Sequence, residues 1–73
     1  MSEKINNLYL YKHKQTIGKR IELARLELNI PVFIMCNTLN VTEPEYLKII
    51  TGKSALNVFQ AICFITETNK PLF

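Results

Sequence analysis

Apolar side chains recur along this chain at the three- and four-residue spacing of an α-helix, and the clearest case begins at Thr42. Thr42 is suited to cap a first turn, and Pro44 falls where a missing N–H costs little. Gly52 supplies a left-handed stop. The apolar positions on one face of this segment are Tyr46, Ile49 and Ile50. The pattern therefore predicts a helix from Thr42 to Thr51, about two and a half turns long.

A second helix is predicted over residues 30–39, directly before this one. Pro31 opens it, Asn40 ends it, and a tight turn joins the two helices. The residues expected to face inward are Met35, Cys36 and Leu39.

Two more predicted helices flank this pair. Upstream, Thr16 is the expected N-cap of a helix that ends near Asn29. Its predicted buried stripe consists of Ile17, Ile21, Leu23, Ala24 and Leu28. Downstream, residues 56–65 form an apolar run with Asn57 and Gln60 as its polar breaks. The length of this run favours a buried helix over a strand.

One set of residues has the layout of a known family. The set consists of Ile17, Gly18, Arg20, Ile21, Arg25, Met35, Cys36, Leu39, Val41, Thr42, Tyr46, Ile49, Gly52 and Lys53. With these anchors the chain resembles the lambda-repressor-like helix-turn-helix family, also called Cro/C1 or XRE, over roughly residues 16–66. The resemblance implies an all-α, compact, four- to five-helix lambda-repressor-like DNA-binding domain. Residues 1–73 would be one domain, with residues 1–15 as an N-terminal extension and residues 67–73 as a tail.

The resemblance also implies which residues contact DNA, because the second helix of the motif lies in the major groove in this family. The matching residues are Thr42, Glu43, Pro44, Leu47 and Lys48. Lys48 can donate to guanine or phosphate, Thr42 can bond a phosphate, and Glu43 can accept from cytosine N4. Apolar contact with a thymine methyl is what Pro44 and Leu47 offer. Further phosphate candidates, with ordinary surface charge as the alternative, are Lys53, Lys19 and Arg20.

Several residues depart from the family pattern. Glu43 and Glu45 can stabilise the positive end of their own helix, and near phosphates the same charges repel. Val32 stands where the family usually has a glutamine that bonds the DNA backbone. Ile50 replaces the glutamate that pairs with the residue matching Arg25, so we expect that arginine to find another acid or to extend into solvent.

The residues 30–39 helix is apolar on nearly every side, which predicts that something covers it. One candidate cover is the bulky segment at residues 8–11, and another is the apolar carboxyl end. We expect a homodimer, since an exposed apolar patch of this kind marks an interface. The alternative is that both ends fold back on their own subunit. The expected interface residues are Val32, Phe33, Ile34, Leu8 and Tyr9.

Composition narrows the function further. The net charge is +3, with most of the basic residues at or before Arg25, which is mildly favourable to a polyanionic partner, with a merely solvated first helix as the equal alternative. We expect Cys36 and Cys63 to be small core residues, and the single histidine, His13, has no metal-ligand neighbours. No metal, cofactor or catalytic residue is therefore predicted, and the chain is not expected to be an enzyme. It carries neither a membrane-spanning stretch nor a signal-peptide pattern, so we expect a cytoplasmic protein without a membrane partner.

Two functions remain in competition. The first is a small transcriptional regulator that binds duplex DNA as a dimer. The second is a degenerate helix-turn-helix domain that binds another protein, as an antagonist or adaptor, without binding DNA. Glu43 and Glu45 would form an acidic rim around an apolar contact surface, which would consist of Leu47, Val32, Phe33 and Ile34. Binding that weakens steeply with salt would favour the first function.

Overall fold

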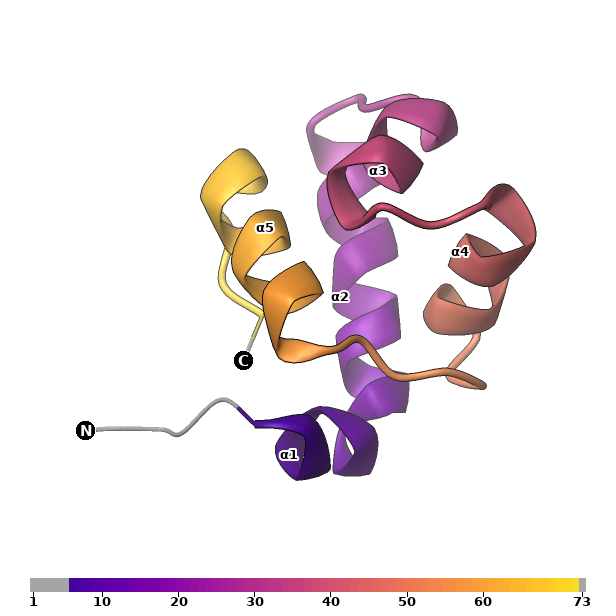
Figure 1. The fold of residues 1–73 in the computed structure, drawn as a ribbon. Coiled ribbons are helices and arrows are strands. Elements are labelled where there is room, and N and C mark those ends of the chain that lie inside the picture. Colours follow the sequence, from indigo (N-terminus) through magenta and orange to yellow (C-terminus); the bar gives the residue numbers. More distant parts are fainter. Residues whose placement is uncertain (1–5, 73) are drawn as a thin grey trace.

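The computed structural model describes residues 6–72, and these form five α-helices joined by short connections (Figure 1). The helices are α1 (Asn7–Lys12), α2 (Lys14–Glu27), α3 (Val32–Leu39), α4 (Glu43–Ile50) and α5 (Val58–Thr68). The longest, α2, runs through the middle, and α4 packs against it, while α5 packs against α3. Within residues 6–72 there is no strand, so the predicted all-α class is confirmed for this part of the chain.

The prediction that Thr16 caps a helix is wrong, because α2 begins two residues earlier. Its N-cap is His13, whose side chain makes no capping hydrogen bond. The chain is already helical when it reaches His13: the His13 N–H donates to the Tyr9 carbonyl (3.1 Å), and the Ile17 N–H donates to the His13 carbonyl (2.9 Å). Thr16 is therefore an exposed residue inside the first turn of α2. The predicted N-terminal extension is continuous with the rest of the fold.

The predicted buried stripe of α2 is only partly correct. Ile17, Ile21 and Ala24 are buried, whereas Leu23 is 60% exposed and Leu28 is 42% exposed. Leu23 follows Ile21 by two residues, which is about 200° around a helix, so the two side chains cannot share a face. Leu28 lies beyond the last helical residue, as the C-cap. After it the chain turns through the left-handed conformation expected at Asn29, with φ of 55°.

Helices α3 and α4 end where the sequence predicts, but α3 begins at Val32, two residues after the predicted start at Ile30. Pro31 is the N-cap residue of α3, and Asn40 ends this helix in the left-handed conformation with φ of 58°. At the start of α4, the Thr42 hydroxyl accepts from the Glu45 N–H (3.3 Å), and the Glu45 carboxylate accepts from the Thr42 N–H (2.8 Å). This reciprocal capping box fixes the first turn of α4.

Helix α5 is confirmed as a helix, and its predicted polar breaks have a structural role. Asn57 and Gln60 form a second capping box, with hydrogen bonds of 2.7 and 2.9 Å. The Gln60 side-chain amide also donates to the Leu39 carbonyl (3.0 Å), which ties the start of α5 to the end of α3. The helix continues to Thr68, three residues past the predicted end.

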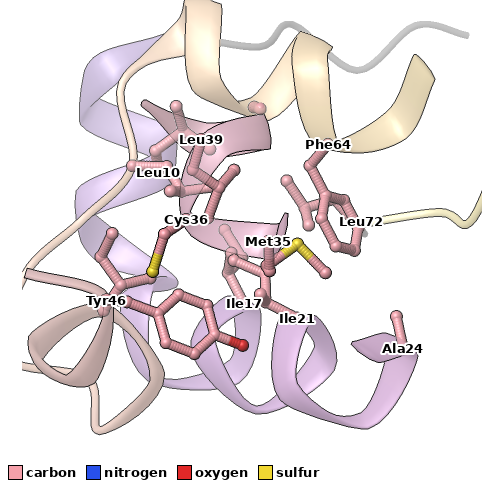
Figure 2. Close-up of a cluster of buried hydrophobic side chains, with 13 residues drawn as sticks. Leu10, Ile17, Ile21, Ala24, Met35, Cys36, Leu39, Tyr46, Phe64 and Leu72 are labelled. Atoms are coloured by element: carbon pink, nitrogen blue, oxygen red, sulfur yellow. The ribbon is translucent and has the colours of Figure 1, made fainter. Parts of the chain in front are cut away.

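The core draws side chains from all five helices and from the carboxyl-terminal segment (Figure 2). Its buried members are Leu10, Ile17, Ile21, Ala24, Met35, Cys36, Leu39, Tyr46, Ile49, Leu56, Ala61, Phe64 and Leu72. Two of these, Leu10 and Leu72, belong to the segments predicted as an extension and a tail. Both ends of the described chain therefore fold back on their own subunit.

The two cysteines differ in burial. Cys36 is buried and Cys63 is only half-buried, and both are free thiols. Burial is the main cause that raises the pKa of the Cys36 thiol, and Glu43 adds to it.

Arg25 pairs with Glu22 in a polar cluster at the edge of the core. The Arg25 guanidinium contacts the Glu22 carboxylate through two hydrogen bonds (2.6 and 2.9 Å) and also donates to the Ile30 carbonyl (3.0 Å). The Tyr46 hydroxyl donates to the same carboxylate (2.7 Å). The hydrogen bond from Arg25 is the main cause that holds the pKa of Glu22 below its ordinary value. Glu22 thereby links α2, the α2–α3 connection and α4.

This cluster predicts a loss of stability in acid. Because the folded-state pKa of Glu22 is lowered, its contribution to stability is present above the unfolded-state pKa, near 4.5, and disappears as the pH falls through the lower folded-state pKa. The melting temperatures of the wild type and of Glu22→Gln should therefore differ most near neutral pH and converge in acid. Thermal melts followed by circular dichroism between pH 7 and pH 2 measure this directly. A difference that stays constant over that range would contradict the assignment.

Candidate nucleic-acid interface

The two buried residues of α4 determine which of its side chains face outward. Tyr46 and Ile49 are 1% and 4% exposed, so the residues between and before them point away from the core. The structure places five predicted DNA-contact residues in exposed positions on α4 or at its N-cap: Thr42, Glu43, Pro44, Leu47 and Lys48. These five residues form the surface that we call the α4 face.

The chemistry of the α4 face is divided along the helix. The first turn of α4 carries Glu43, a member of this face, and also Glu45, whose carboxylate is engaged in the capping box. The Thr42 oxygen accepts a hydrogen bond in the same box, which leaves its O–H free to donate to an acceptor such as a phosphate oxygen. Lys48 lies in the last turn, and Leu47 is 54% exposed. The α4 face therefore has an acidic end, an apolar centre and a basic end.

Two more predicted residues border the basic end of α4. Gly52 turns the chain with φ of 82°, and the Lys53 N–H donates to the Lys48 carbonyl (2.8 Å). This turn brings Lys53 to the surface immediately after the helix. Lys19, on α2, lines a surface groove together with Ile50 of α4. Lys48 and Lys53 thus lie at one end of α4, and Lys19 lies on the neighbouring α2 beside Ile50.

Arg20 is separated from this group, although it is the sequence neighbour of Lys19. Its guanidinium donates to the Leu72 carbonyl (3.0 Å) and so lies against the carboxyl-terminal segment. Successive residues on a helix point about 100° apart, which sends these two side chains in different directions. In this structure Arg20 anchors the carboxyl-terminal segment.

The five predicted interface residues do not form one patch. Phe33 and Ile34 lie in the first turn of α3 and are 66% and 41% exposed, while Val32 is half-buried against the core. Leu8 is 66% exposed on α1, and the Tyr9 ring lies 4.4 Å from the His13 ring. Helix α1 precedes α2 and α3 follows it, so the two groups lie near opposite ends of a helix about 20 Å long. The segment at residues 8–11 therefore does not cover the exposed residues of α3.

One basic surface is not predicted by the sequence pattern. It lies where α1 meets α2, and it follows from the earlier start of α2. A surface hollow there is lined by Tyr11, Lys12, His13, Lys14, Gln15 and Thr16. An earlier helix start at Lys14 would have placed Lys14, Gln15 and Thr16 on the first turn of α2, but only the tertiary structure shows that this turn lies against the loop that follows α4.

No protein-family model, curated protein or solved structure matches the chain. Among residues 6–72, no group of three or more His, Cys, Asp and Glu side chains is arranged to hold a metal ion. None of the helices in this part of the chain combines the length and the apolar character needed to cross a bilayer. The geometry of the α4 face is thus the main guide to function.

Proposed function

We propose that this chain is a small transcriptional regulator of the lambda-repressor-like helix-turn-helix type, which binds duplex DNA as a homodimer through α4. The single observation that carries the proposal is the α4 face. A short helix with a fixed first turn projects its polar side chains outward and is bordered at one end by Lys19, Lys48 and Lys53. The spacing of the family anchors in the sequence supports the same function.

In the proposed complex, α4 lies in the major groove. An α-helix is about 10–12 Å across with its side chains, close to the width of that groove. Lys48 donates to guanine or to a phosphate, Glu43 accepts from cytosine N4, and Leu47 contacts a thymine methyl. Because Glu43 and Glu45 repel phosphates, non-specific binding is weakened and affinity depends more on base contacts. A homodimer would present two copies of α4 to a two-fold-symmetric site.

Selection of duplexes from a random DNA library by the purified protein at moderate salt tests this proposal. We expect enrichment of a two-fold-symmetric site that contains guanine or cytosine opposite α4. The double variant Lys48→Ala/Lys53→Ala should bind the selected site more weakly, while its melting temperature should stay close to that of the wild type because both side chains are exposed. Folded protein that enriches no sequence would overturn the proposal.

A protein-binding function is the second candidate, and the exposure of three apolar side chains favours it. Phe33, Leu47 and Ile34 are 66%, 54% and 41% exposed, and Leu47 shares α4 with the acidic Glu43 and Glu45. A module of this kind would act as an antagonist or adaptor of another regulator. Leu47→Asp and Phe33→Asp would then abolish partner binding, whereas Lys48→Ala and Lys53→Ala would leave it intact. Salt dependence separates the functions as well, because an apolar interface is little affected by salt.

A further inference from the structure

Positive charge is segregated at the end of the molecule where α1 meets α2. Between residues 6 and 21 the sequence contains no Asp or Glu, and Glu22 is the first acid of the described chain. Lys12 and Lys14 lie on either side of His13, and Lys12 is an exposed residue in the last turn of α1. A basic surface without an interspersed acid has a positive potential that attracts polyanions.

Tyr11 gives this surface a defined geometry. The Lys14 ammonium lies over the Tyr11 ring, 4.2 Å from its centroid. A cation–π contact of this kind holds the charge in one place and leaves the remaining ammonium protons for an acceptor. Lys12, His13 and Gln15 line the same surface hollow as these two residues. We call residues 11–15 the basic corner.

The basic corner is joined to the basic end of α4. A Cβ atom at Gly52 would lie only 2.6 Å from Gln15 Cγ, so the turn after α4 rests directly on the first turn of α2. Lys53 follows Gly52 in that turn. Figure 1 shows the same relation, with α1 and the connection from α4 to α5 at one end of α2. Lys48 and Lys53 therefore lie at the end of α4 whose following turn contacts the basic corner, away from the acidic start of α4.

We infer that the basic corner contacts the sugar–phosphate backbone of the duplex that α4 engages, outside the base pairs contacted by α4. This inference rests on the proposed function and adds a specific backbone contact to it. Charge complementarity identifies the occupant, since lysine ammonium groups bind phosphates as point charges and the corner contains no acid to repel them. Attraction between these lysines and the phosphates at this end of α4 offsets the repulsion that Glu43 and Glu45 cause at the other end.

The test compares two labelled duplexes that carry the selected site. One ends at the outermost selected base pair, and the other continues on each side by one helical turn, roughly 10 base pairs. Fluorescence anisotropy is used to measure Kd at several salt concentrations. The wild type should bind the longer duplex more tightly. Lys12→Gln/Lys14→Gln should bind the longer duplex on the order of tenfold more weakly, and its slope of log K against log salt should shrink by about 1.8, or about 0.9 for each lost phosphate contact.

Two control variants make the result specific. Lys70→Gln removes one lysine near the opposite end of α2, where Lys70 pairs with Glu27 (2.9 Å), and should leave the slope unchanged. Lys12→Gln alone alters only an exposed side chain, so it should fold even if the double variant does not. It should reduce the slope of log K against log salt by about 0.9, half of the change expected for the double variant. Unchanged affinity and slope in both corner variants, with tight binding by the wild type, would overturn this inference alone. Failure of the wild type to bind either duplex would overturn the proposed function together with it.

Discussion

Gly18→Ala is expected to destabilise the protein, although alanine is the better helix former. In the middle of an exposed helix this substitution would stabilise by about 1 kcal/mol. Here α2 and α4 approach so closely that a Cβ atom at position 18 would overlap the Ile49 carbonyl oxygen. The obstacle is backbone that a rotamer change cannot move aside. Overpacking of this kind typically costs about 1–3 kcal/mol, and we expect the upper end of that range.

Thermal and urea denaturation of Gly18→Ala measure this effect. A loss of about 3 kcal/mol would lower the melting temperature of a domain of this size by roughly 12–24 °C. Thr16→Ala is the matched control, since Thr16 is an exposed residue in the same helix, and it should change stability by only about 0.5 kcal/mol or less. A Gly18→Ala protein that is as stable as the wild type, or more so, would show that the two helices are farther apart than described.

The same substitution should also reduce DNA binding under the proposed function. The contact at Gly18 sets the distance between α2 and α4, and Lys19 borders the groove between these helices. A displaced α4 would no longer hold Lys19 and Lys48 in the same relative positions. We expect binding of the selected site to weaken at temperatures at which the variant is still folded.

Leu10→Ala is expected to cause the other large loss of stability, from a position outside the family-like segment. Leu10 is 0% exposed and belongs to the main core. Truncating a buried leucine removes its burial free energy and leaves a cavity, which together cost about 2–5 kcal/mol. A domain of 73 residues has a total stability of roughly 4–11 kcal/mol, so this loss is a large fraction of the total.

Leu8→Ala provides the control for Leu10→Ala, because both residues lie in α1 and undergo the same chemical change. Leu8 is 66% exposed, so its truncation should alter the free energy of unfolding by about 0.5 kcal/mol or less. Urea titrations of both variants give the two values under the same conditions. Equal losses in the two variants would mean that α1 does not pack on the core as described.

Much of the local structure was predictable from the sequence. The reciprocal bonds of Thr42 and Glu45, the left-handed conformation of Asn40 and the burial of Tyr46 all depend on residues within one or two turns of each other. Capping and helical periodicity act over that range, so a single chain segment carries the information. The outward residues of α4 follow from the same local rules, and the structure exposes all five of them.

The tertiary structure decided which residues of different helices come together. Periodicity gives the face of a helix on which a side chain lies, but it does not say which element packs against that face. For that reason the sequence left open what residues 8–11 pack against, and it did not predict the attachment of Arg20 to the carboxyl-terminal segment. The contact between Gln15 and the Gly52 turn joins residues far apart in the chain, and it places the basic corner beside α4. Contacts of this kind depend on how all the helices pack around one core, and no short stretch of sequence determines them.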